Sequence, residues 1–433
     1  MMQRWSVAVV ACGVALLESA GAVPAEEAVA AIEAYVQPYL DAAAFDGVVL
    51  IAEGEGITYR GAFGKASYEL DVAMHAEQRF RIASLSKQIT QVLIARLVDR
   101  GGLDLDAPVA EVLPEFAHGQ RISTAQLIEH QAGVPHTNSL AWMDTTKTMM
   151  LEAIVERLSA MPLDFEPGTQ RRYSNGGYAL LAAILERRSG VPYGVLLSEE
   201  LADYPSLGHE GPFALVPRMA SRYAPGEQFG KRARATTYHV WNRIGGGSLY
   251  GAADDVFRLF FDAYHGRLVS PQVSERLFPP PTAPVLVTGR SPGALAQVFF
   301  DPDLELTVLT LSSNSGWPAS FTPDIARLYA GDAAQLVPAD LADTVDAGAA
   351  QRLAGAYLGE QFAWRVALVP SSDGHLVWVH DELRTAFAPT RAGAWYLPIY
   401  DWLCEFTGEG GATMACRQRD PRSEVRFTFA RQP

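Results

Sequence analysis

The sequence predicts an α+β protein in which one antiparallel sheet is flanked by helices and a mainly helical subdomain, followed by a small C-terminal antiparallel β domain. Three observations lead to this prediction. Strand-like apolar segments stand at both ends of a long helical middle, which favours a sheet assembled from distant parts of the chain. Short alternating segments separated by turn residues fill the last part of the chain. The length of 433 residues exceeds what one ordinary core requires, which favours two domains.

The first elements of the folded chain are a helix and a hairpin. Apolar residues recur at helical spacing over residues 26–44, which predicts an amphipathic helix. Residues 45–64 combine an apolar run, a Gly-Glu-Gly turn and a returning strand, which is typical of a β-hairpin. A long apolar helix is expected over residues 84–98, because Gly101 and Gly102 shortly after it are typical of a helix end.

The middle of the chain, residues 105–240, is predicted to be mainly helical and is interrupted by several prolines. Strand character returns at residues 295–300 and 304–311, and a last helix is expected over residues 322–329. Strands on both sides of a helical middle indicate an α+β arrangement.

The composition changes after residue 330. Residues 331–350 are rich in Ala, Asp and Gly, which is typical of a linker. Beyond them the chain alternates apolar and polar residues in short segments, which predicts a small antiparallel β domain or barrel. These segments are residues 364–369, 375–379, 394–397 and 424–429.

The N-terminus is predicted to be a signal peptide. Arg4 supplies a positive charge, and the apolar stretch over residues 7–17 is too short to span a bilayer. Small residues at positions 20–22 offer a cleavage site, so we expect a secreted or periplasmic chain that starts near Val23. No later segment approaches the length of a transmembrane helix.

The expected division is therefore a signal peptide over residues 1–22, a first domain over residues 23–335 and a β domain over residues 350–433. Two other interpretations of the N-terminal segment stay open. It could be a buried first helix, or Cys12 could carry a lipid, because the residues before it are similar to a lipobox.

Composition and cysteine content narrow the class of protein. Apolar residues make up 48% of the chain and charged residues 19%, which is typical of globular domains. The net charge of −14 argues against nucleic-acid binding, since phosphate contacts need clustered Lys and Arg. Only Cys404 and Cys416 remain once the predicted signal peptide is removed. They are either a disulfide across a hairpin, formed in an oxidising compartment, or two buried thiols.

Ser84 and Lys87 stand three residues apart at the start of a predicted helix. This spacing places both side chains on one helix face. The positive end of the helix dipole disfavours a second positive charge, which lowers the pKa of Lys87 toward that of a usable base. A neutral amine beside a hydroxyl activates it for attack on a carbonyl, and N–H groups at the helix start can hold the oxyanion. Such pairs are common by chance, so the prediction depends on other residues.

Two later segments supply those residues. Tyr173 and Asn175 stand at the start of a second apolar helix. A phenol near Lys87 can carry a proton between groups, and an Asn amide can bind both a substrate amide and the amine. Thr288 and Gly289 come just before the returning strands, where a glycine lets the backbone approach a cleft closely.

The three segments together resemble the sequence motifs of serine β-lactamases and penicillin-binding peptidases, in particular the class C β-lactamase and esterase or D-aminopeptidase branch. The motifs are, in order, Ser84-Leu85-Ser86-Lys87, Tyr173-Ser174-Asn175 and Thr288-Gly289. Residues 101–108, 124–135 and 245–251 are also similar to stretches of this family, and the resemblance covers roughly residues 30–330. The C-terminal segment is similar to β domains appended to some esterases and D-aminopeptidases.

The resemblance implies a β-lactamase-like fold and acyl transfer through a covalent ester on Ser84. Lys87 and Tyr173 would share the general base and acid roles, and the N–H groups of Ser84 and Arg290 would form the oxyanion hole. The residues implied in substrate binding are Asn175, Thr288, Gly289 and Arg290. The resemblance implies no cofactor or metal ion and a small-molecule or peptide substrate, and it leaves the oligomeric state open.

The third motif departs from the family pattern at its first position, where Val287 replaces the usual Lys or His. This removes a charge-assisted bond to a substrate carboxylate of about 1.5–3 kcal/mol. Arg290 would restore the charge only if its side chain faced the same way. An ester, amide or D-amino-acid peptide is therefore favoured as substrate. The alternatives are a β-lactamase or D-alanyl-D-alanine carboxypeptidase, or a catalytically impaired homologue that binds cell-wall material or a partner.

His130 and His136 are close enough in sequence to suggest a pair of metal ligands. Their separation differs from the i, i+4 helical spacing used by zinc enzymes. We therefore interpret them as residues of a structural turn.

Overall fold

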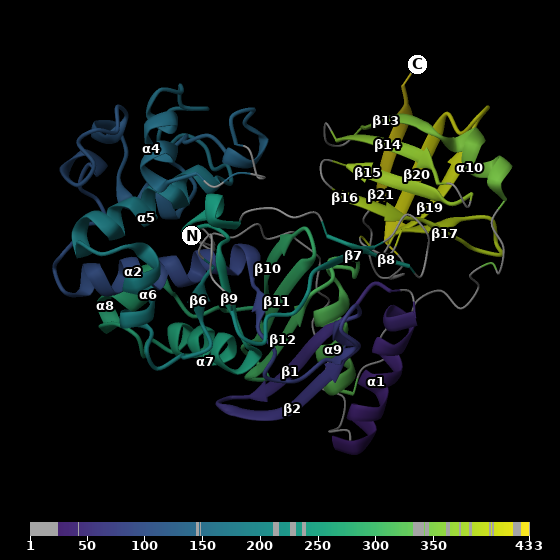
Figure 1. Ribbon diagram of the computed structural model, residues 1–433, viewed down its shortest axis with the longest axis horizontal. Coiled ribbons are helices and arrows are strands. Elements are labelled where there is room, and N and C mark those ends of the chain that lie inside the picture. Colours follow the sequence, from purple (N-terminus) through teal and green to yellow (C-terminus); the bar gives the residue numbers. More distant parts are fainter. Residues whose placement is uncertain are drawn as a thin grey trace.

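The computed structural model describes residues 25–41, 43–143, 147, 149–210, 216–225, 231–235, 240–331, 342, 346–360, 364–371, 374–380, 383–397, 400, 402–418 and 426–432. Figure 1 shows a domain of helices and strands and, beside it, a C-terminal domain built mainly of strands. The predicted signal peptide and Cys12 lie outside the described residues. Within the described part of the chain, no helix is long and apolar enough to cross a membrane.

A five-stranded antiparallel sheet forms the centre of the first domain, with the strand order β10-β11-β12-β1-β2. Its strands are β1 (Gly47–Glu53), β2 (Gly56–Phe63), β10 (Val285–Ser291), β11 (Ala294–Asp301) and β12 (Leu306–Ser312). Strand β1 pairs with β12 from the far end of the domain, with Leu50 opposite Leu309. The predicted sheet of distant segments and the predicted β1–β2 hairpin are both confirmed.

Helices cover both faces of this sheet (Figure 1). The covering helices are α1 (Ala25–Asp41), α2 (Ser86–Asp99), α7 (Ala253–Tyr264) and α9 (Phe321–Tyr329). Val49 and Ile51 of β1 pack with α1 and α9, whereas Val48 and Leu50 pack with α2 and α7. Because successive side chains of a strand point to opposite faces, two covered faces require the nearly continuous apolar sequence of β1.

In its described residues, the predicted helical region over residues 105–240 contains four α-helices, but loops and short turns make up most of it, so it is less helical than predicted; α8 lies beyond it. These helices are α3 (Thr124–Ile128), α4 (Leu151–Ser159), α5 (Asn175–Ser189), α6 (Tyr193–Glu200) and α8 (Pro271–Leu277). Helix α5 is buried over most of its length, so it is apolar on every side. The Ser174 hydroxyl accepts the Gly177 N–H at its start, and Gly190, with φ of 76°, ends it.

Short strands and 3₁₀ turns, which the sequence did not predict, connect the larger elements. The strands are β3 (Lys65–Ser67), β4 (Val72–Ala73), β5 (Phe80–Arg81), β6 (Gly208–His209), β7 (Tyr223–Pro225), β8 (Arg232–Arg234) and β9 (Leu249–Gly251). The turns are η1 (Ala83–Leu85), η2 (Val109–Glu111), η3 (Gly119–Arg121), η4 (Thr137–Ser139) and η5 (Val240–Arg243). These strands of two or three residues are too short to leave an alternating pattern in the sequence.

The C-terminal domain is a nine-stranded antiparallel sheet that curls into a nearly closed barrel (Figure 1). Its strand order is β16-β15-β14-β13-β21-β20-β19-β18-β17. Helix α10 (Ala347–Leu353) precedes the strands β13 (Gly355–Gly359), β14 (Arg365–Pro370), β15 (Leu376–His380), β16 (Leu383–Ala386), β17 (Ala388–Pro389), β18 (Trp395–Leu397), β19 (Trp402–Thr407), β20 (Thr413–Gln418) and β21 (Arg426–Arg431). The predicted antiparallel β domain is confirmed, and Trp378 and Trp402 lie buried in its core.

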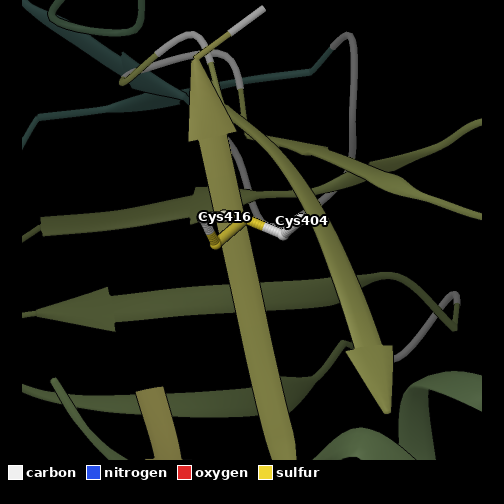
Figure 2. Close-up of a disulfide and its surroundings, with 2 residues drawn as sticks. All are labelled: Cys404 and Cys416. Atoms are coloured by element: carbon white, nitrogen blue, oxygen red, sulfur yellow. A yellow bond between two sulfur atoms is a disulfide. The ribbon is translucent and has the colours of Figure 1, made fainter. Parts of the chain in front are cut away.

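A disulfide joins the neighbouring strands β19 and β20 of this domain (Figure 2). Cys404 and Cys416 stand directly opposite each other in the strand register, with their Cα atoms 4.0 Å apart. Gly408, Gly410 and Gly411 in the connection all have positive φ, which glycine adopts without steric cost. Of the two interpretations of this cysteine pair, the disulfide is therefore confirmed.

Candidate active site

Ser84 lies in the 3₁₀ turn η1, immediately before α2, rather than inside the helix. The preceding Ala83 has a φ of 46°, a left-handed conformation that costs energy for a residue with a side chain. The Ser84 hydroxyl is 2.7 Å from the hydroxyl of Tyr173. The side chain of Tyr173 thus contacts the predicted nucleophile directly. Lys87 lies on the face of the Tyr173 ring.

Lys87 is completely buried in the first turn of α2. Its Nζ donates to the Asn175 side-chain oxygen at 2.6 Å and to the Gly246 carbonyl at 2.5 Å. The same Nζ lies 4.6 Å from the centre of the Tyr173 ring. A neutral amine has two N–H donors and one lone pair, so these two acceptors leave the lone pair available to take a proton.

Burial holds the pKa of Lys87 well below its usual value, and the positive charge of Arg243 lowers this pKa further. The predicted direction of the shift is therefore confirmed, but its main cause differs from the predicted one. Desolvation of the charged form is the main cause, because the amine is completely buried and has no carboxylate partner among the described residues.

The segment that enters α5 delivers Tyr173 and Asn175 to the site. Ser174 between them is the N-cap of the helix, and both of its neighbours reach Lys87, Asn175 through its side-chain oxygen and Tyr173 through its ring. The Asn175 amide uses both ends: its oxygen accepts from Lys87, and its nitrogen donates to the Asn138 side-chain oxygen at 2.9 Å. These two hydrogen bonds orient the Asn175 amide so that its oxygen faces the Lys87 amine and its nitrogen faces Asn138.

His130 and His136 hold this segment from the loop that follows α3. The Ser174 N–H donates to Nδ1 of His130 at 3.1 Å, and the Asn175 N–H donates to Nδ1 of His136 at 3.2 Å. The pKa of His130 is lowered to about 3 and that of His136 to about 4, and burial of the rings is the main cause of both shifts. The structural interpretation of the two histidines is confirmed, whereas their contact with the second motif is a feature that sequence reasoning missed.

Gly289 brings strand β10 against the Ser84 turn. A Cβ atom at this position would lie 2.8 Å from the backbone nitrogen of Ser84, a distance that real Cβ atoms do not reach. Glycine is therefore required if the strand is to run this close to the nucleophile. The peptide N–H of Arg290, the predicted second oxyanion donor, follows directly after this contact.

The side chains around Gly289 point in two directions. Val287 is buried in the core on the α2 side of the sheet. The Thr288 hydroxyl instead accepts from Gln297 at 3.1 Å, and Gln297 also contacts α9 through Thr322. The Arg290 guanidinium donates to the carbonyls of Ser315 and Trp317 at 2.8 and 3.2 Å, and burial lowers its pKa to about 10.

The guanidinium of Arg290 thus does not take the place of the missing cation at position 287. The reason is the alternation of a strand: residue 290 lies three positions further on, so its side chain leaves the strand on the opposite face. The substrate-binding roles of Thr288 and Arg290 remain predictions. Because their side chains bond to other groups of the protein, we expect their backbone rather than their side chains to contact the substrate.

A glycine-rich loop closes the site behind Lys87. Gly246 supplies the carbonyl that accepts from the amine, and a Cβ atom there would lie 3.2 Å from both Lys87 Nζ and the Asn175 oxygen. The N–H groups of Gly246 and Gly247 both donate to the Arg243 carbonyl, which places Arg243 at the base of this loop. Sequence reasoning missed Arg243, although the similar stretch over residues 245–251 begins two residues after it.

The chain is similar to known proteins over most of its first domain. The family described as "Beta-lactamase" matches residues 32–333. Penicillin-binding protein 4* of Bacillus subtilis is 29% identical over 255 residues, which are 54% of this chain and 56% of that protein. Esterase EstB of Burkholderia gladioli is 29% identical over 249 residues, 49% of this chain and 63% of that protein. The chain thus spans roughly three fifths of the length of these relatives.

Solved structures show the same fold. The D-amino acid amidase from Ochrobactrum anthropi SV3, in a complex with L-phenylalanine amide, has a TM-score of 0.59 and 18% sequence identity. The match covers 66% of this chain and 92% of that one. With the family match extending over more than half of its residues, the chain belongs to the beta-lactamase family.

Proposed function

We propose that this protein is an exported serine hydrolase that forms an acyl-enzyme on Ser84 and acts on a neutral ester, an amide or a D-amino-acid peptide. The observation that carries this proposal is the 2.7 Å contact between the Ser84 and Tyr173 hydroxyls beside the buried amine of Lys87. A serine hydroxyl is a weak nucleophile until a neighbouring base takes its proton. Lys87 has the lone pair for that role, and its Nζ lies 4.6 Å from the ring centre of Tyr173, whose hydroxyl contacts that of Ser84.

In the first step, the Ser84 oxygen attacks the carbonyl carbon of the substrate while its proton passes toward Tyr173 and Lys87. The N–H groups of Ser84 and Arg290 hold the negative oxygen of the tetrahedral intermediate. The proton then moves to the leaving group, the bond to that group breaks, and an ester on Ser84 remains. Water then attacks this ester and gives a proton to the same base; the bond between the acyl carbon and the Ser84 oxygen breaks, the carboxylic acid leaves, and the proton returns to Ser84.

The preference for a neutral substrate rests on the third motif. Val287 is apolar and buried, and the nearby Arg290 guanidinium is held by two backbone carbonyls. A substrate carboxylate therefore lacks the charged partner that the family usually supplies, which costs about 1.5–3 kcal/mol of binding. The names of the similar esterase and of the similar D-amino acid amidase support an ester or amide as the bond that is cleaved.

Export is proposed from the N-terminal sequence, with its positive residue, short apolar stretch and small residues at positions 20–22. The Cys404–Cys416 disulfide supports it, because disulfides persist mainly in oxidising compartments. Expression in a bacterial host with the native N-terminus tests the point. We expect the mature chain in the periplasm, with its N-terminus near Val23.

Labelling with a fluorophosphonate and a fluorescent penicillin, side by side on wild type and Ser84→Ala, tests the chemistry. The wild type should react with the fluorophosphonate and hydrolyse p-nitrophenyl esters, and Ser84→Ala should do neither. Penicillin labelling should be at least about tenfold slower than for enzymes with the usual cation. Hydrolysis of a chromogenic cephalosporin at about 10 per second or faster, the median of enzymes, would favour the β-lactamase alternative. A wild type that reacts with no probe would favour the impaired homologue.

A further inference from the structure

The loop over residues 130–138 contacts all three residues of the Tyr173-Ser174-Asn175 segment. Its histidine rings lie beside the phenol, with ring centres 4.8 Å apart for His130 and 5.5 Å for His136. The Ser174 hydroxyl donates to the carbonyl of residue 135 at 3.0 Å. The two backbone N–H groups of the segment donate to the two imidazoles, as described above. One short loop therefore holds the motif that carries both the phenol and the amide of the site.

The backbone of His130 adds a second connection. This residue has a φ of 59°, in the left-handed region, where non-glycine residues are strained. Its carbonyl accepts the Arg172 N–H at 2.9 Å, while its ring accepts the Ser174 N–H. His130 therefore binds the chain on both sides of Tyr173, through its carbonyl to Arg172 and through its ring to Ser174.

Both imidazoles can serve in this way only when they are neutral. Nδ1 accepts a hydrogen bond through its lone pair, and protonation would turn it into a donor that faces another N–H. His130 is surrounded by the amine of Lys87, the guanidinium of Arg171, His136, and the phenols of Tyr173 and Tyr178. His136 faces Lys87, Arg243 and Tyr173. The guanidinium groups of Arg171, near His130, and Arg243, near His136, carry positive charge, which disfavours an imidazolium ion at either ring.

We propose that His130 and His136 are positioning residues for the acyl-transfer reaction. As neutral imidazoles they hold the N–H groups of Ser174 and Asn175, and thereby set the Tyr173 hydroxyl on Ser84 and the Asn175 oxygen on Lys87. This inference rests on the proposed function. Reacting groups displaced by about 1 Å can lose about 10²-fold in rate, so the hydrogen bonds of a supporting loop have a measurable catalytic effect.

The test compares variants that keep or remove the acceptor. Asn carries its oxygen on Cγ, as His carries Nδ1, so His130→Asn and His136→Asn keep an acceptor near the original position. His130→Phe and His136→Phe keep a ring of similar shape but have no acceptor. We expect each Phe variant to lower kcat for p-nitrophenyl ester hydrolysis by about 30–100-fold with KM changed less than about threefold, and each Asn variant to recover at least about a tenth of wild-type kcat. Melting temperatures show whether each variant is folded.

The two histidines differ in burial, so the test has a result even if one variant does not fold. His130 is buried, so a Phe variant there could fail to fold; His136 is only half-buried, and its pair of variants then decides. Phe variants that are folded and turn over like wild type would overturn the proposal. Equal losses in folded Phe and Asn variants would also overturn it, because the acceptor would then have no part in the effect.

A second measurement does not depend on turnover. In wild type labelled with ¹⁵N-histidine, we expect Nδ1 of both residues to be unprotonated down to pH 5, with the proton on Nε2. A protonated Nδ1 on either residue would overturn the proposal for that residue while leaving the proposed function intact. If instead the wild type reacts with no probe although both Nδ1 atoms are acceptors, the proposed function fails, and the positioning role that rests on it fails with it.

Discussion

The two walls of the candidate site differ in what they present to a substrate. One wall, made by the start of α2 and the start of α5, presents functional side chains that are joined by hydrogen bonds. These side chains are Ser84, Lys87, Tyr173 and Asn175. The opposite wall, strand β10, presents backbone: Gly289 lies against the Ser84 turn, and the polar side chains of Thr288 and Arg290 bond to groups on the far face of the sheet.

This difference separates the chemistry of the site from its recognition of substrate. Forming and breaking an acyl ester requires a nucleophile, a base and oxyanion donors, and in the proposed function the side-chain wall and the β10 backbone supply all three. A cation at the start of the third motif matters for substrates that carry a carboxylate. We therefore expect the buried Val287 in its place to weaken the binding of substrates that carry a carboxylate without changing the groups proposed for acyl transfer.

The largest loss of activity is expected when the proposed base, Lys87 of the side-chain wall, is removed. Lys87→Met keeps the length and apolar contacts of the side chain but removes the amine. We expect kcat for p-nitrophenyl ester hydrolysis to fall by about 10²–10⁴-fold, the range of a positioned acid–base group. Steady-state kinetics measures this directly, and a variant within tenfold of wild type would assign the base role to another residue.

The stability of the same variant provides an independent check of the neutral amine. In the unfolded chain an ordinary lysine is protonated at pH 7, whereas the folded Lys87 has a pKa well below its usual value. Because the unfolded state binds the extra proton, the stability of the wild type should rise with pH until the ordinary lysine pKa is reached. Urea unfolding at pH 7 and pH 9 should show a larger gain for wild type than for Lys87→Met.

On the backbone wall, a substitution at Gly289 should lower kcat strongly, whereas a substitution at Thr288 should change it little. Gly289→Ala places a Cβ where only 2.8 Å separates it from the Ser84 nitrogen, so the strand or the turn must move. We expect kcat to fall by about 10²-fold, as for other displacements near 1 Å. Thr288→Val is the matched control, because it removes a hydroxyl that bonds Gln297 on the far face. It should keep kcat within about threefold and lose about 1 kcal/mol of stability.

These positions also show what the sequence could and could not predict. The large sheet and its covering helices follow from apolar periodicity, because both faces of β1 and β12 are buried and the pattern is long. The side-chain wall follows from the order of the motifs along the chain. The direction of Arg290 could not be predicted, since alternation gives a face only once the register of the strand with its neighbours is known.

The contacts of His130 and His136 could not be predicted either, because they also depend on tertiary structure. Nothing in the spacing of His130 and His136 indicates that their rings accept the N–H groups of a segment about forty residues later in the sequence. The pKa of Lys87 illustrates the same limit. Its lowering could be predicted in direction from the helix start, but its main cause is complete burial, which depends on the tertiary packing of α5 and the glycine-rich loop.

The smallest predicted effect concerns Arg243, which adds positive charge behind the side-chain wall. Its charge helps to keep Lys87 neutral, so Arg243→Met should raise the pKa of Lys87 and leave less free amine at a given pH. The acidic limb of the kcat/KM profile should therefore move to higher pH, by less than about one unit because burial is the larger cause. Arg243→Lys keeps the charge and should keep the wild-type profile. A shift of equal size in both variants, or a shift to lower pH, would mean that Arg243 acts through the shape of the glycine-rich loop, whose N–H groups its carbonyl accepts.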